Sequence, residues 1–161
     1  MAKIEQKQPV VEEIKGLVVG AKAIVLVDYR GLTVAEDTEL RKRLRNAGVV
    51  YKVYKNTMLN FAFKGTVFES LSKNLEGPSA VAFGMGDATA PARVLSECIK
   101  TMPKLEFKAG VVEGTYFDQT GIQVIATIPS REVLISRLLG SMQSPIASFA
   151  RVLKQIAEKA A

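Results

Sequence analysis

The segment from residue 131 to residue 160 constrains the fold of this chain more than any other. Large apolar side chains recur in it every three or four residues, which is the spacing of one face of an α-helix. These side chains belong to Leu134, Ile135, Leu138, Leu139, Met142, Ile146, Phe149, Leu153 and Ile156. Ser130 is a residue type that caps helix N-termini, so the pattern predicts one long helix over 131–160.

Such a helix would extend about 45 Å, whereas a compact domain of about 130 residues has a radius of gyration of about 14 Å. We therefore expect the helix to outreach its own domain and to leave much of its apolar face for partner helices. Pro145 predicts a kink, which would divide that face into two docking segments. The segment carries five basic and two acidic residues, a net charge of +3, which favours an acidic partner.

Two other arrangements of this helix stay open at the level of sequence. The helix could fold back onto the sheet as part of the core, or it could pair with a second copy of itself as a coiled coil. The apolar face is wider than the two-position seam of a dimeric coiled coil, which disfavours the second arrangement.

Composition excludes several classes of protein. The 161 residues include no His and a single Cys, Cys98, so histidine-based catalytic sets, histidine zinc sites and internal disulfides are excluded. We expect no catalytic residue, no metal and no cofactor. The net charge of +6 suggests a polyanionic partner. Because the chain has neither a membrane-length apolar run nor an N-terminal signal peptide, we expect a cytoplasmic protein without membrane contact.

The remaining patterns predict a globular α+β domain. They indicate helices over 9–19, 33–48, 56–63, about 89–100 and 118–126, with a short helix after Thr66, and strands over 23–29, 49–54, 79–83, 107–112 and 115–117. The last two strands form a hairpin around Glu113–Gly114, so we expect a two-layer sandwich with helices on one side of the sheet. The break at 128–130 divides the chain into a globular domain, 1–128, and a helical segment, 129–161.

Within the globular domain, three residues are predicted to cap helices through their side chains. Thr33 with Glu36, and Thr66 with Glu69, fit the capping-box pattern. Asn56 can cap the helix over 56–63.

A basic cluster occupies residues 41–55. Six cations stand there without an acidic residue: Arg41, Lys42, Arg43, Arg45, Lys52 and Lys55. Tyr51 or Tyr54 could stack on an unpaired base while the cations hold the phosphates, and Lys55–Asn56–Thr57 opens a helix, where a phosphate can bind. A solvated helix face with a basic bias is the alternative, but Arg30–Gly31 ahead of the cluster adds weight to nucleic-acid binding.

Three functions compete on these features. The first is a scaffold with RNA at one end and partner dimers at the other. The second is a small enzyme that binds a nucleotide at Gly84–Met85–Gly86–Asp87, a weak motif because Thr89 stands where the third glycine belongs. The third is a basic nucleic-acid-binding protein that self-associates through its last helix.

An ordered set of motifs resembles one known family over essentially the whole chain. The motifs are Asp28–Thr33, Leu40–Gly48, Tyr51–Thr57, Gly77–Phe83, Ile128–Glu132 and Leu138–Gly140. Together they resemble the bacterial ribosomal stalk-base proteins, the tenth protein of the large subunit.

The resemblance implies a protein of two parts. The globular domain would be a ferredoxin-like α/β sandwich variant that binds large-subunit ribosomal RNA beside a neighbouring stalk-base protein. The long helix would be a spine for dimers of the acidic stalk-arm protein, whose mobile domains recruit translational GTPases. Because the spine is short, we expect two dimers.

The resemblance and the residue patterns together give two sets of predicted site residues. The predicted ribosomal-RNA-binding residues are Arg30, Gly31, Arg41, Arg45, Lys52, Tyr54, Lys55, Asn56 and Thr57. The predicted stalk-arm-binding residues are Leu134, Leu138, Leu139, Met142, Ile146, Phe149, Leu153 and Ile156.

Overall fold

The computed structural model describes residues 8–160, without the side chain of Ala160. The chain divides into two compact units, Met1–Ile128 and Pro129–Ala161.

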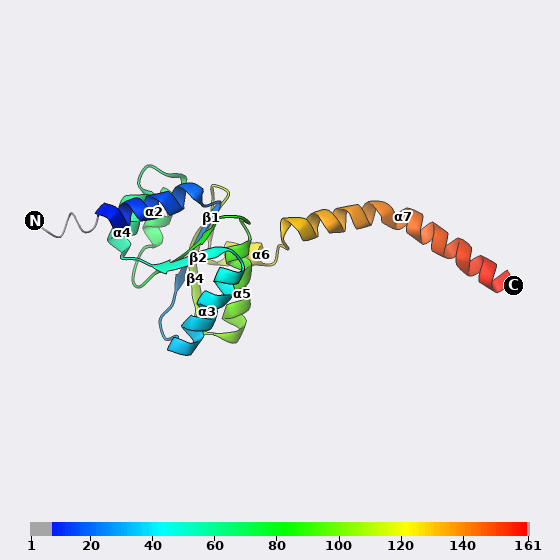
Figure 1. Ribbon diagram of the computed structural model, residues 1–161, viewed down its shortest axis with the longest axis horizontal. Coiled ribbons are helices and arrows are strands. Elements are labelled where there is room, and N and C mark those ends of the chain that lie inside the picture. The colour runs from blue at the N-terminus through cyan, green and yellow to red at the C-terminus, as the bar shows by residue number, and fades with distance from the viewer. Residues whose placement is uncertain (1–7, 161) are drawn as a thin grey trace, which may run out of the picture. The chain divides into compact units, whose positions relative to one another are not determined.

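The first unit is built on a five-stranded sheet (Figure 1). Its strands are β1 (Ala23–Asp28), β2 (Val49–Val53), β3 (Ala80–Gly84), β4 (Glu106–Val112) and β5 (Thr115–Asp118). The order is β2-β3-β1-β4-β5, and every neighbouring pair is antiparallel. Glu113 and Gly114, both with positive φ, turn the β4–β5 hairpin. The predicted α+β class and the predicted hairpin are confirmed.

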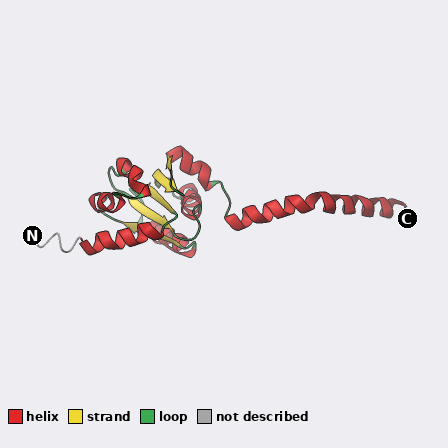
Figure 2. Cartoon of the chain, turned by 90° about the horizontal axis from the view of Figure 1, so that it is seen from above, coloured by secondary structure: helices red, strands yellow, loops and turns green. Residues whose placement is uncertain are grey.

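Helices cover both faces of this sheet, not one. On one face lie α3 (Val34–Asn46), α5 (Ala90–Thr101) and α6 (Gln119–Ala126). On the other lie α2 (Gln8–Gly20), α4 (Asn56–Phe63) and the 3₁₀-helix η1 (Val67–Asn74). Figure 2 shows the strands enclosed between helices.

The prediction of a two-layer sandwich is therefore wrong in its number of layers. The order β2-β3-β1-β4, with α3 and α5 on one face, has the ferredoxin-like arrangement. A third layer is added by α2 and by α4 with η1, which are inserted between β2 and β3. The physical reason lies in β1, whose six residues are all buried, so that the sheet needs cover on both faces.

One of the three predicted caps is present. Glu36 Oε2 accepts a hydrogen bond from the Thr33 backbone N–H at 2.7 Å, and Thr33 Oγ1 accepts one from the Glu36 N–H at 3.3 Å, which forms the capping box of α3. The other two predictions are wrong. The Thr66 hydroxyl donates to the Phe63 carbonyl at 2.7 Å, and the N-cap position of α4 is Lys55, without a side-chain bond.

The second unit consists of α7 (Arg131–Ala160), which has the bounds that the sequence predicts. Pro145 lies inside this helix, and the helix continues through it; Figure 1 shows α7 bending along its length. None of the helices in residues 8–160 combines the length and the apolar character needed to cross a bilayer.

The loop from Gly84 to Thr89 is shaped by close packing. A Cβ added at Gly84 would lie 2.7 Å from Pro91 Cγ and 3.1 Å from the Asp87 carbonyl oxygen. Asp87 Oδ1 accepts from the Thr89 backbone N–H at 3.2 Å and so closes the turn before α5. These contacts explain the glycine and the aspartate of the loop without a nucleotide.

We expect Gly84→Ala to lower the free energy of unfolding by about 1–3 kcal/mol, because the new methyl group must displace Pro91 or backbone. Gly86→Ala is the matched control. No atom lies within 4 Å of a Cβ at Gly86, and its effect should stay within about 0.5 kcal/mol. Chemical denaturation of both variants measures the difference, and equal stabilities would contradict the packing argument.

Candidate RNA-binding and protein-binding surfaces

Strands β1 and β2 end, and strands β3 and β4 begin, at the same end of the sheet. Several predicted RNA-binding residues lie there. Ala80 at the start of β3 is paired with Val53 and with Val27, and Asp28 is paired with Glu106. The segments at this end of the sheet are 28–31, 53–57, 75–80 and 104–108. We call these segments the basic sheet end. Arg30, Gly31, Lys55, Asn56 and Thr57 lie within it.

Asp28 holds the Arg30 side chain in place at the basic sheet end. The Arg30 backbone N–H donates to Asp28 Oδ1 at 3.0 Å, and the Arg30 Nε–H donates to Asp28 Oδ2 at 2.9 Å. Burial raises the pKa of the Asp28 carboxyl, but the bonds from Arg30 and the charge of Lys108 outweigh burial and hold the pKa below its usual 3.8. Arg30 is thereby fixed in orientation while most of its side chain stays exposed.

Lys108 holds the loop before β3, and no sequence signal had singled it out. Its ammonium donates to the carbonyl oxygens of Glu76 and Pro78 at 2.7 and 2.6 Å, and to Ser79 Oγ at 3.0 Å. It also lies 3.8 Å from Asp28 Oδ2. A lysine in an apolar strand pattern could have drawn attention, because a half-buried ammonium needs several acceptors.

The Asn56 side chain also binds the loop before β3. Its side-chain amide donates to the carbonyl oxygens of Leu75 and Gly77 at 2.8 and 2.7 Å. These two bonds tie the start of α4 to the loop before β3. The amide N–H groups of Asn56 are therefore used inside the protein, and its neighbours Lys55 and Thr57 are the exposed members of the motif.

A surface pocket of about 480 Å³ lies at the basic sheet end. Asp28, Arg30, Gly31, Lys104 and Glu106 line it. Gly31 has a φ of +80°, and a Cβ there would lie 3.1 Å from Lys104 Cδ, so the turn requires glycine. Within residues 8–160, no group of His, Cys, Asp and Glu side chains could hold a metal ion.

The fold disperses the basic cluster of residues 41–55. Arg41 pairs with Asp37 at 2.7 Å, Arg43 pairs with Glu39, and Lys52 pairs with Glu13 of α2. Arg41 belongs to the face of α3, and Lys52 to the opposite face of the sheet. Arg45 is in the last turn of α3, whose chain continues into the start of β2, so it lies toward the other end of the sheet. Of the six cations, only Lys55 lies at the basic sheet end beyond the reach of a described carboxylate.

The two tyrosines differ in what they can contact. Tyr51 is only 8% exposed and lies under Arg41, whose guanidinium carbon is 5.3 Å from the ring centroid. Burial, with a smaller contribution from Asp37, raises the pKa of Tyr51. Of the two tyrosines predicted as alternatives for stacking on a base, Tyr51 is therefore too buried, and Tyr54 stays a prediction. Tyr54 is half-buried, and its hydroxyl donates to Glu13 Oε1 at 3.4 Å.

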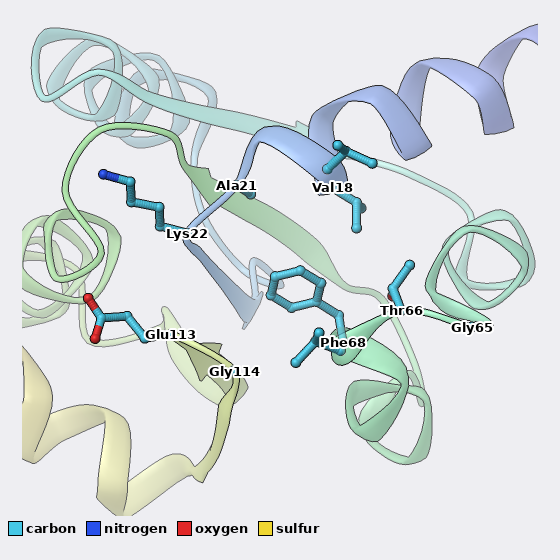
Figure 3. A pocket seen from close by; sticks show the side chains of 10 residues that line it. Val18, Ala21, Lys22, Gly65, Thr66, Phe68, Glu113 and Gly114 are labelled. Carbon is cyan, nitrogen blue, oxygen red and sulfur yellow. The ribbon is translucent and has the colours of Figure 1, made fainter.

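A second pocket, of about 530 Å³, lies at the opposite end of the sheet (Figure 3). It is formed by the end of α2, the turn before η1, and the β4–β5 hairpin. Its lining is mainly apolar and includes the buried Val18 and Phe68 and the exposed Lys22 and Glu113. None of the predicted site residues lines it.

The apolar face of α7 is exposed along its whole length. The eight predicted stalk-arm-binding side chains range from 44% exposed at Leu134 to 75% exposed at Ile146. At about 100° per residue they fall within an arc of roughly 140°. Within the described residues 129–160, the second unit contains no other helix or strand that could cover this arc. We call it the α7 apolar face.

Comparison with known proteins gives matches over nearly the whole chain. A family model described as Ribosomal protein L10 matches residues 2–100, and one described as Ribosomal protein uL10 C-terminal region matches residues 128–161. The large ribosomal subunit protein uL10 of Finegoldia magna is 49% identical over 158 residues, covering 98% of this chain and 88% of the relative. That of Clostridioides difficile is also 49% identical over 158 residues, covering 98% of this chain and 94% of the relative.

The Asp28 network should make stability depend on pH. Because the folded pKa of Asp28 lies below its unfolded value, the carboxylate stabilises the fold above pH 3.8 and loses that contribution as pH falls through the folded pKa. We expect Asp28→Asn to cost about 1–2 kcal/mol near neutral pH, and the difference from wild type to shrink below pH 3.8. Glu97→Gln, at an exposed carboxylate, is the control. Urea unfolding at pH 7 and pH 3 measures both, and a pH-independent difference would contradict the network's role.

Proposed function

Because the chain belongs to the ribosomal protein uL10 family, we propose that it forms the base and spine of the ribosomal stalk, with RNA bound at one surface and stalk-arm dimers at another. The family consists of structural proteins of the large ribosomal subunit. The chain is therefore a ribosomal protein that acts in translation, and not an enzyme. The predictions of the family, of a structural ribosomal role and of a location in the ribosome are confirmed, and the nucleotide-binding enzyme is excluded.

The exposed α7 apolar face is the observation that carries the spine proposal. A lone helix cannot bury its own apolar surface, and we expect this surface to be buried against other chains. The eight side chains of the face range from 44% to 75% exposed, so burying what remains exposed, at about 1.5–3 kcal/mol for a whole side chain, corresponds to a gross gain of about 7–14 kcal/mol. That is of the same size as estimates of the cost of association, about 4–15 kcal/mol. Partner helices that cover the whole face would therefore bind better than helices that cover a part of it.

The occupants that we propose are dimers of the acidic stalk-arm protein. The net charge of +3 on this segment favours acidic partners. Pro145 divides the face into a segment with Leu134 and Leu138 and a segment with Phe149 and Leu153. One dimer on each segment gives two dimers per chain. Their mobile domains would recruit translational GTPases, which this chain would contact only indirectly.

For the other surface we propose that the basic sheet end binds large-subunit ribosomal RNA, beside a neighbouring stalk-base protein. Arg30 and Lys55 are exposed cations on adjoining loops, and Thr57 adds an exposed hydroxyl. The loops are held in place by the bonds of Asp28, Asn56 and Lys108, so their cations are presented on a rigid surface. Tyr54 lies within this surface, and the predicted contacts from Arg41 and Arg45 on α3 and from Lys52 on β2 would be separate from it.

Substitution of the α7 apolar face tests the spine. We expect Leu138→Asp with Leu153→Asp to abolish capture of the stalk-arm protein, because each charge enters the centre of one segment. Ser136→Asp with Gln155→Asp adds the same charge on the polar side of the helix and should leave capture intact. Native mass spectrometry of co-expressed chains should show four stalk-arm copies per wild-type chain. A wild-type chain that instead forms a stable dimer with itself, without stalk-arm protein, would favour the self-associating alternative.

Charge reversal at the basic sheet end tests the RNA surface. We expect Lys55→Glu to weaken binding of deproteinised large-subunit ribosomal RNA about tenfold or more, and to lower the slope of log affinity against log salt by about 0.7–1. Lys42→Glu, an exposed position on α3, makes the same change in net charge and should have a clearly smaller effect. Filter binding at several salt concentrations measures both. Equal losses would mean that only overall charge matters, and that the basic sheet end is not the contact.

A further inference from the structure

Phe61 is an exposed aromatic residue that the predicted site does not include. It lies on α4, where its neighbours Leu59, Ala62 and Phe63 are fully buried against the sheet. Phe61 itself is 61% exposed, and it is the one exposed large apolar side chain of this helix. A single exposed side chain of this kind is too small an apolar area for a protein interface, but it suffices for one aromatic stacking contact.

The groups around Phe61 are polar or positively charged. Thr57, Asn60 and Lys64 are exposed. Thr57 and Lys64 are four and three residues from Phe61, and Asn60 is three residues from Thr57 and four from Lys64. All three therefore share one helix face with Phe61. The Lys64 ammonium lies 5.6 Å from the centroid of the Phe61 ring. From Lys55 to Lys64 the chain has two lysines and no acidic residue. An aromatic ring beside a cation, on a helix that carries no carboxylate of its own, matches the chemistry of a base followed by phosphates, although the Glu69 carboxylate lies 3.4 Å from the Gly65 backbone nitrogen next to Lys64.

This face continues the basic sheet end. α4 starts where β2 ends, and the two bonds from Asn56 fix that start to the loop before β3. Phe61 follows Lys55 by six residues, a rise of about 9 Å along the helix. One RNA strand that lies over Lys55 can therefore also reach Phe61 and Lys64.

We propose that the exposed face of α4 binds an unpaired segment of RNA, with Phe61 stacked on a base and with Lys55 and Lys64 holding phosphates on either side. This inference rests on the proposed binding of ribosomal RNA and adds to it the class of RNA that is recognised. The bases of a paired helix are already stacked on one another, so the contact selects a loop, a bulge or a single strand.

The absence of Trp from the sequence makes the contact directly measurable. In a Phe61→Trp variant, the new indole is the sole tryptophan, and stacking on a base should quench its fluorescence. Val124→Trp is the matched control, because Val124 is 66% exposed on α6, which covers the other face of the sheet. Both variants are titrated with deproteinised large-subunit ribosomal RNA and with a fully paired RNA duplex. We expect quenching only in Phe61→Trp and only with the ribosomal RNA.

The RNA affinities of further Phe61 variants distinguish base stacking from the alternatives. Phe61→Leu keeps an apolar side chain without a ring and should weaken binding about 5- to 150-fold, the range for loss of one stacked base, whereas Phe61→Tyr should restore it. If ribosomal RNA binds both tryptophan variants and depends on Lys55, but does not quench the indole of Phe61→Trp, the stacking inference is overturned and the proposed function stands. If no variant and no wild-type chain binds this RNA, both are overturned. Quenching by purified stalk-arm protein in place of RNA would assign the face to a protein and overturn the inference.

Discussion

The burial of strand β1 on both faces is the constraint on which the first unit depends. All six of its residues are buried, and it is hydrogen-bonded to β3 on one side and to β4 on the other. Its apolar side chains therefore require helices above and below the sheet, which is why the unit has three layers. The strand ends at Asp28, and Arg30 is held by that carboxylate. Where the central strand stops thus decides where the cations of the basic sheet end stand.

The second unit also has a large apolar surface, but nothing within the described part of that unit buries it. A helix buries an apolar face only against a neighbour, and α7 has no neighbour inside its own unit. The first unit buries most of its apolar side chains in the two cores on either side of the sheet, and the basic sheet end carries mainly polar and charged groups. The second leaves its apolar surface uncovered within residues 129–160. One surface suited to a polyanion and one suited to apolar helices are what a scaffold between RNA and protein requires.

Local patterns predicted the elements well and their side-chain contacts less well. The spacing of apolar residues gave α7 its bounds, and the Thr33–Glu36 pair gave the cap of α3, because both depend on residues within a turn or two. Asn56 was expected to cap its own helix, but carbonyl oxygens nineteen and twenty-one residues away compete successfully for its amide. The double cover of the sheet was within reach of the sequence, since a strand without polar alternation predicts it.

The sequence by itself determined the order of helices and strands, the apolar face of α7 and the family, since each follows from residue types at fixed spacing along the chain. Only the tertiary structure decided which cations remain available. The Lys52 ammonium is paired with Glu13, which lies thirty-nine residues earlier in the chain. Tyr51 is buried under Arg41. Lys108 is held by backbone oxygens of a distant loop. Charges act through space and not along the chain, so their partners are known only when the sheet has brought separate segments together.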